Sequence, residues 1–221
     1  MTARKGAAEP WWWAAIAAAA ILLAAGFLAT RPPTAGPSAP TPPIAAQPQP
    51  GDGRIRVSPG HELLVDLPGG PQERVTSMLA VTGPMRFGEF VWNDRGVPPG
   101  RTWVRVDLDR QLVSVFRSGE EIGTAVILYG ANNAPTPLGW HQVIARERDH
   151  YSRTYDAPMP YMLQLTPDGV ALHASVVREG RATHGCIGLP YAFAAKLFDA
   201  MRKGDAVLVL GSPRNAGLTA S

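Results

Sequence analysis

The chain has 221 residues, of which 18% are charged and 45% are apolar, and its formal net charge is +3. This length accommodates one globular domain together with additional segments. No dense run of lysine and arginine occurs in the sequence. Because duplex nucleic acid is bound by clustered cations that neutralise phosphates, the charge pattern argues against a nucleic-acid partner.

An apolar segment occupies residues 11–29, WWWAAIAAAAILLAAGFLA, and carries no charge. As a helix it would rise about 28 Å, close to the hydrocarbon thickness of a bilayer. Arg4 and Lys5 precede it, and three tryptophans open it, as at a membrane interface. Residues 1–30 are therefore predicted to be an uncleaved signal-anchor. The alternative is a cleaved signal peptide, since 23–26 offers small residues to a peptidase.

A spacer follows at residues 31–52, which are rich in proline and alanine and show no periodicity. Such sequences favour extended, polyproline-like conformations and cannot bury apolar area. The remaining chain is expected on the periplasmic or extracytoplasmic side, anchored to the inner membrane by 11–29, or secreted if that segment is removed. We divide it into an N-terminal extension at 53–100, a main domain at 101–211 and a loose tail at 212–221.

The main domain shows mostly strand patterns. Residues 102–108 alternate apolar and polar side chains, and turn residues separate them from two further strands, which predicts a β-meander. Within the extension, 72–81 has a weak helical spacing. Asp168-Gly169 supplies turn residues for a hairpin over 161–175. The predicted strands are 87–94, 102–108, 111–117, 120–130, 140–147, 161–166, 170–175 and 205–211.

One helix is predicted, over residues 190–204. Pro190 suits its first turn and Gly204 suits the position just after its end. Phe193 and Leu197 begin an apolar stripe that would dock on a sheet. Residues 148–160 are polar and aromatic without a strand pattern, and are predicted to be a long loop. The fold class expected is mainly β, with one flanking α-helix.

Cys186 is the only cysteine, and it lies in the polar stretch RATHGCIGLP. Oxidising compartments favour paired cysteines, so a lone exported thiol is either buried and inert, bonded to another chain, or retained for its reactivity. His173 lies near the end of the strand before this stretch, and a folded-back loop would bring its imidazole to the sulfur. An imidazole that takes the thiol proton activates it for acyl transfer, and the amides of Gly185 and Cys186 suit an oxyanion hole.

Two other interpretations stay open at this point. His173 can be a satisfied core histidine, with Cys186 as a small buried hydrophobe. A zinc site would combine His184 and Cys186 with His173 or His150, although the paired spacing typical of zinc ligands is missing.

The residues LHAS…THGCIGLP resemble the signature of the L,D-transpeptidase catalytic domain family: an upstream histidine, a spacer, then Ser/Thr-His-Gly-Cys. APTPLGWHQV is similar to the family's Thr-Pro-x-Gly loop, and APMPYMLQLT to the strand before the signature. The resemblance covers roughly 101–211 and implies a β-sandwich-like fold. It also implies peptidoglycan stem peptides as partners, 3→3 cross-linking through a cysteine thioester, and no metal or organic cofactor.

By this resemblance, Cys186 is the nucleophile and His173 the general acid and base. The backbone carbonyl of Ala174 would orient the base, Gly185 would supply an oxyanion-hole amide, and His184 would support them. The loop 148–160 would act as a lid, and a candidate substrate-binding residue is Tyr161.

Two departures from the family pattern are present. Gly188 stands where an arginine is common, so Arg178 and Arg181 become candidate substrate contacts. The spacer between His173 and Cys186 is also short. An L,D-carboxypeptidase or hydrolase using the same thioester, and a non-catalytic wall-binding module, are the alternative functions.

Overall fold

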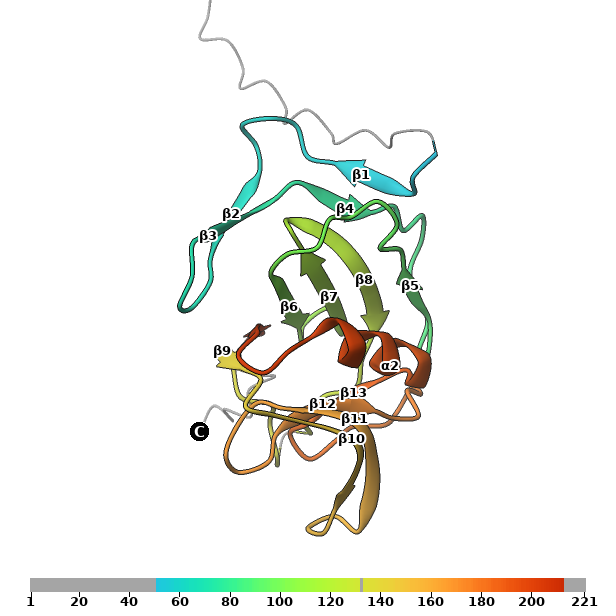
Figure 1. Ribbon diagram of the computed structural model, residues 1–221. Coiled ribbons are helices and arrows are strands. Elements are labelled where there is room, and N and C mark those ends of the chain that lie inside the picture. Colours follow the sequence, from blue (N-terminus) through green and yellow to red (C-terminus); the bar gives the residue numbers. More distant parts are fainter. Residues whose placement is uncertain (1–50, 132, 213–221) are drawn as a thin grey trace, which may run out of the picture. The chain divides into compact units, whose positions relative to one another are not determined.

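A computed structural model describes residues 51–131 and 133–212 of the chain (Figure 1). The apolar segment predicted at 11–29 lies outside the described residues, as do almost all of the predicted spacer and tail. Among the residues that the structure describes, no helix is long and apolar enough to cross a membrane.

The described residues form three β-sheets and one helix (Figure 1). The first sheet has the order β1-β4-β8-β7-β6-β14-β9, with β5 paired to β8. The second has the order β10-β11-β12-β13, and β2 and β3 form a separate pair. The elements are β1 (Arg54–Arg56), β2 (Leu63–Asp66), β3 (Gln72–Val75), β4 (Ser77–Leu79), β5 (Phe90–Trp92), β6 (Thr102–Asp107), β7 (Leu112–Arg117), β8 (Glu120–Val126), β9 (Gly139–Gln142), β10 (Ala145–Ser152), β11 (Ala157–Gln164), β12 (Ala171–Ala174), β13 (Ile187–Leu189), α2 (Tyr191–Ala200) and β14 (Ala206–Leu210).

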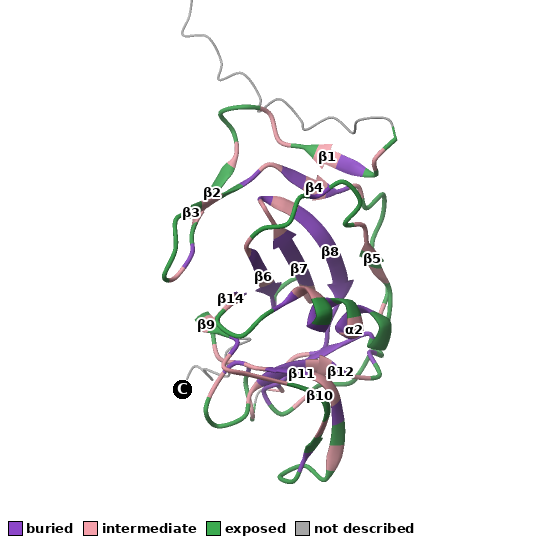
Figure 2. Cartoon of the chain, viewed as in Figure 1, coloured by how far each residue is buried: buried purple, intermediate pink, exposed green. Residues whose placement is uncertain are grey.

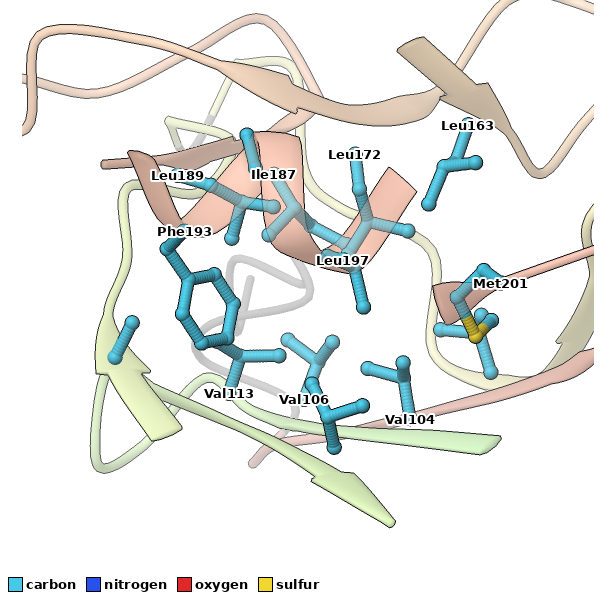
Figure 3. Packing of buried hydrophobic residues seen from close by; sticks show 14 of the residues in the cluster. Val104, Val106, Val113, Leu163, Leu172, Ile187, Leu189, Phe193, Leu197 and Met201 are labelled. Atoms are coloured by element: carbon cyan, nitrogen blue, oxygen red, sulfur yellow. The ribbon is translucent and has the colours of Figure 1, made fainter. Parts of the chain in front are cut away.

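The predicted β-meander is confirmed: β6, β7 and β8 pair antiparallel in chain order. Val104 and Val106 of β6 point to one face of the sheet and are completely buried. Figure 3 shows that face meeting the apolar stripe of α2, which includes Phe193 and Leu197. Leu172 and other residues of the second sheet complete the same core, so the two sheets and the helix share one hydrophobic interior.

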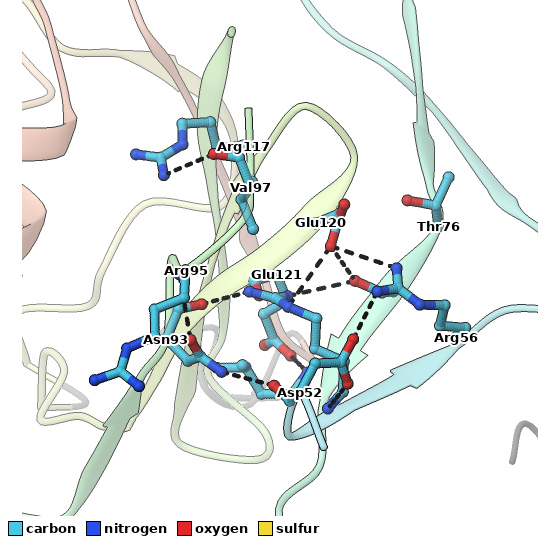
Figure 4. Close-up of polar contacts among 12 residues, drawn as sticks. Asp52, Arg56, Thr76, Asn93, Arg95, Val97, Arg117, Glu120 and Glu121 are labelled. Carbon is cyan, nitrogen blue, oxygen red and sulfur yellow. Dashed lines mark hydrogen bonds and ion pairs between the residues drawn. The ribbon is translucent and has the colours of Figure 1, made fainter. Parts of the chain in front are cut away.

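The residues before 101 belong to this fold, since β1, β4 and β5 extend the first sheet. The weak helical spacing over 72–81 was misleading, because those residues form β3 and β4. Arg54 is almost fully buried and donates to the backbone carbonyls of Glu121 (2.5 Å) and Asn93. Its ion pair with Glu120 spans 3.6 Å, and Figure 4 shows this group of polar contacts. A buried cation thus ties the N-terminal segment to β8.

The long loop predicted over 148–160 was wrong: most of it belongs to the antiparallel hairpin β10–β11. The far half of this hairpin is largely exposed (Figure 2), so its side chains show no apolar alternation. Backbone pairing and the turn residues hold it, with Tyr151 Oη donating to Asp156 Oδ1 at 2.7 Å. The hairpin predicted over 161–175 is confirmed by the pairing of β11 with β12.

The predicted helix is confirmed, but it ends at Ala200 rather than near Gly204. Met201 already has an extended backbone, with φ −92° and ψ 153°. A tight turn follows, in which the amide of Arg202 donates to Asp205 Oδ2 at 2.6 Å. Gly204, at φ 93°, serves that turn and donates to the carbonyl of Val143 instead of terminating the helix.

Candidate active site

The parallel pairing of β12 with β13 brings the predicted histidine and cysteine to one face of the second sheet. Leu172 pairs with Ile187, and both point into the main core. Since side chains alternate along a strand, His173 and Cys186 point to the opposite face. The register puts His173 opposite Gly188, two residues beyond Cys186, so the histidine and the cysteine are diagonal neighbours.

A cavity of about 620 Å³ opens on that face and is the largest of those described. Both His173 and Cys186 line it, together with Tyr155 and His184. Its volume lies in the range typical of ligand sites in proteins. The strand pairing therefore delivers a thiol and an imidazole to one space large enough for a peptide.

The orientation of His173 is set by its neighbour. Its Nδ1 lies 2.8 Å from the carbonyl oxygen of Ala174, the contact that the resemblance implied. A carbonyl only accepts hydrogen bonds, so Nδ1 carries the proton and Nε2 is left bare to accept one. Burial lowers the pKa of His173 below its ordinary value, and the bond to Ala174 offsets part of that effect. The imidazole is therefore neutral and basic at Nε2 near neutral pH.

The thiol of Cys186 is hydrogen-bonded elsewhere than to the imidazole that was expected to take its proton. Its Sγ donates a hydrogen bond to the carbonyl of Gly169 at 3.8 Å, and no hydrogen bond joins it to His173 among the described residues. Burial raises the pKa of the Cys186 thiol, and the negative charge of Asp168 adds to this. Met159 and Met162 pack beside the sulfur in an apolar cluster, which explains the burial. The resting site thus holds a neutral thiol rather than a thiolate.

Hydrogen bonds to backbone oxygens hold the turn that carries Cys186. Thr183 Oγ1 donates to the carbonyl of Cys186, and Thr136 Oγ1 donates to the carbonyl of Gly185 at 2.9 Å. Gly185 has φ +102°, a conformation that strongly favours glycine. Sequence reasoning missed Thr136, although the quoted Thr-Pro-x-Gly segment contains it.

The β10–β11 hairpin contributes a residue that the sequence did not single out. The ring of Tyr155 stacks on that of His184, with centroids 5.1 Å apart and planes 20° apart. Both rings line the cavity. The stretch 148–160 was predicted to form a lid. Tyr155 lies within this stretch, and that position is the signal that would have pointed to it.

The candidate substrate contacts divide into two groups. Arg181 lines the cavity, whereas Arg178 and Tyr161 do not. The ring of Tyr161 instead packs edge-on against the rings of Tyr191 and Phe198, which both belong to α2. Of these three residues, only Arg181 therefore borders the cavity.

Gly188, at the position where the resemblance led us to expect an arginine, is closely packed. Its backbone exchanges hydrogen bonds with Leu128, and a Cβ built on it would lie 3.3 Å from Leu128 Cβ. The same Cβ would lie 3.0 Å from Ser175 Cβ. A side chain at this position would therefore require Ser175 and Leu128 to shift slightly.

The alternative prediction was a zinc site that combines His184 and Cys186 with His173 or His150. Within residues 51–131 and 133–212, no group of three or more His, Cys, Asp or Glu side chains is arranged to hold a metal ion.

The chain is similar to solved structures of L,D-transpeptidases. A crystal structure of an L,D-transpeptidase from Stackebrandtia nassauensis is 27% identical, covers 52% of this chain and 58% of its own, and has a TM-score of 0.48. One from Enterococcus faecium is also 27% identical, covers 51% of this chain and 50% of its own, and has a TM-score of 0.46.

Curated sequences and a family model give the assignment. L,D-transpeptidase 1 of Mycobacterium tuberculosis is 34% identical over 115 residues, covering 44% of this chain and 46% of that protein. This chain therefore spans about half the length of the curated relatives it matches. Residues 101–209 match the YkuD model, the L,D-transpeptidase catalytic domain. The resemblance found in the sequence is confirmed, and residues 101–209 form an L,D-transpeptidase catalytic domain of the YkuD family.

Proposed function

We propose that this chain is a peptidoglycan L,D-transpeptidase that forms 3→3 cross-links, or attaches other amines to stem peptides, through a thioester on Cys186. One observation carries the proposal: a single cavity is lined by the thiol of Cys186 and by His173, whose Nδ1 is committed to Ala174. The free Nε2 is a base suited to the thiol proton. Binding alone would need neither group.

The first half-reaction begins from the neutral pair. Rotation of the Cys186 side chain away from Gly169 brings its S–H to Nε2 of His173. The sulfur attacks the carbonyl carbon at the L-centre of the diamino acid in a tetrapeptide stem, while Nε2 takes the proton. The peptide bond to the terminal D-Ala then breaks, and its nitrogen leaves with the proton from His173.

The second half-reaction resolves the thioester. The side-chain amine of a neighbouring stem attacks the thioester carbonyl, and Nε2 of His173 takes the proton of that amine. The C–S bond breaks and the proton returns to the sulfur of Cys186. The product is a 3→3 cross-link, and neither step calls on a metal or an organic cofactor.

The catalytic domain would lie outside the inner membrane and be anchored to it. The apolar segment at 11–29 would hold the enzyme at the outer face of the inner membrane, and the spacer at 31–52 would let the domain reach the wall. Fractionation of cells before and after carbonate extraction tests this: the full chain should stay with the membrane, and a chain lacking 1–30 should not be exported.

Muropeptide analysis tests the reaction. Wall sacculi are incubated with the enzyme or with Cys186→Ala, digested, and analysed by mass spectrometry. Dimers linked 3→3 should appear only with the wild type. Tripeptide stems without new dimers would assign the same thioester to an L,D-carboxypeptidase. Unchanged muropeptides, with binding to sacculi by both proteins, would refute catalysis in favour of a wall-binding module.

A further inference from the structure

A threonine hydroxyl lies behind the nucleophile and is fully buried. Thr136 Oγ1 accepts a hydrogen bond from the amide of Gly130 and donates one to the carbonyl of Gly185, each at 2.9 Å. The hydroxyl therefore bridges two segments 55 residues apart, from Gly130 to Gly185. Thr136 does not line the cavity that contains Cys186, so it lies outside the space that a substrate would occupy.

The bond to Gly185 determines the direction of a second group. The carbonyl of Gly185 and the amide of Cys186 belong to the same planar trans peptide, so they point in opposite directions. With the carbonyl turned toward Thr136, the amide of Cys186 points away from it. Among the described residues, no acceptor is bonded to the amides of Gly185 and Cys186. These two N–H groups are free to donate to a substrate oxygen.

The turn needs an external constraint to keep this direction. Gly185 has no side chain and sits at φ +102°, so its own sterics leave the peptide after it free to rotate. Thr183 Oγ1 holds the next carbonyl, that of Cys186. The amide of Cys186 thus lies between two carbonyls that are each bonded to a threonine hydroxyl.

We propose that Thr136 is a positioning residue for the oxyanion hole: its hydroxyl fixes the Gly185–Cys186 peptide so that the Cys186 amide faces the oxyanion that forms during acyl transfer. This inference rests on the proposed function. An N–H donor helps the transition state only when it is already aimed at the developing charge. The hydroxyl of Thr136 supplies that aim without contacting the substrate.

Two reactions of the Cys186 sulfur distinguish a misaligned oxyanion hole from a general loss of thiol reactivity. Opening of a carbapenem by Cys186 passes through a tetrahedral oxyanion, with the ring C–N bond breaking and the ring nitrogen taking a proton. Alkylation by iodoacetamide displaces iodide and forms no oxyanion. Both rates are measured by intact mass on full-length chain that circular dichroism shows to be folded, because unfolded chain is alkylated but not acylated. Their ratio then reports the oxyanion hole separately from the exposure of the thiol.

Thr136→Val should lower the ratio of acylation to alkylation by about 10- to 100-fold, because a donor that is misaimed but still present should cost less than the roughly 10²- to 10³-fold of a donor that is removed. Thr136→Ser keeps the hydroxyl and should retain the ratio within about threefold. The matched control is Thr76→Val, which removes a hydroxyl bond to the carbonyl of Gly119 (3.3 Å) far from the cavity. That control should leave the ratio unchanged.

Different outcomes would refute the role of Thr136 and the proposed function. A Thr136→Val ratio equal to that of the wild type would overturn the inference, as would a loss in Thr136→Ser as large as in Thr136→Val. If Thr136→Val does not fold, Thr136→Ala, which leaves room for a water at the Gly130 amide, carries the same expectation. If the wild type forms no carbapenem adduct at Cys186, the proposed function itself fails.

Discussion

Replacing His173 with alanine should slow acylation of Cys186 at pH 7 by about 100-fold or more. The magnitude follows from the pKa of the thiol, which burial raises above its ordinary value of 9.0. A thiol with a pKa of 9 is about 1% thiolate at pH 7, and a higher pKa lowers that fraction further. Without an imidazole to take the proton, only this minor species can attack. The loss falls within the range measured for removal of a general base.

The pH profile should change with the loss of the base. In the wild type, burial places the pKa of His173 below its ordinary value of 6.5. The imidazole is then already neutral above that pH, and the acylation rate should be nearly constant from about pH 6.5 to 8. In His173→Ala the rate should follow the thiolate fraction and rise about tenfold per pH unit over the same interval.

The assay is intact-mass measurement of carbapenem adduct against time, at several pH values, with Cys186→Ala as the control that forms none. His184→Ala should lose far less than His173→Ala, because His184 stacks on Tyr155 and has no bond to the base. The reasoning is refuted if His173→Ala loses less than about tenfold at pH 7, or if its rate does not rise with pH.

Three substitutions test the fold and the Gly188 position by urea unfolding. Arg54→Met should destabilise the chain by about 2–6 kcal/mol, because it leaves the carbonyls of Glu121 and Asn93 without this donor and leaves Glu120 with the exposed Arg56 as its ion-pair partner; a loss below about 1 kcal/mol would contradict this. Leu197→Ala should cost about 2–5 kcal/mol by opening a cavity between α2 and the sheets, and a neutral result would show that the helix is loosely packed. Gly188→Arg should cost more than about 1 kcal/mol and slow acylation, since its Cβ meets Ser175 at 3.0 Å; faster acylation would mean that the family arginine is tolerated here.

Much of the fold could be read from local patterns. In β6 and β7 one face packs into the main core and the other carries polar residues such as Arg105, Asp107 and Ser114, so the apolar residues alternate. The helix has an apolar stripe and a proline at its start. Hydrophobic periodicity did not identify every strand. The far half of the β10–β11 hairpin is largely exposed to solvent, so burial selects no apolar alternation there, and β3 and β4 are too short to show a period.

Part of the site could also be read from the sequence. A lone cysteine two residues after a histidine in a small, polar stretch, with another histidine upstream, indicated Cys186 and His173 as candidates, and the structure places both at one cavity. The wider LHAS…THGCIGLP signature indicated the family, whose model matches residues 101–209. The resemblance implied the contact between His173 and the carbonyl of Ala174, which the structure contains. The two residues are adjacent in sequence, so this contact depends little on the packing of distant segments.

The sequence determined which groups can react, since a thiol, an imidazole and a flexible glycine turn are properties of the residues themselves. Only the tertiary structure decided the relative positions of these groups and their hydrogen-bond partners. Parallel pairing of β12 with β13 sets the two-residue offset between His173 and Cys186, and the methionines around the sulfur keep it protonated at rest. The support from Thr136 was equally hidden, because a hydrogen bond between residues far apart in the chain depends on how the segments pack and leaves no local pattern.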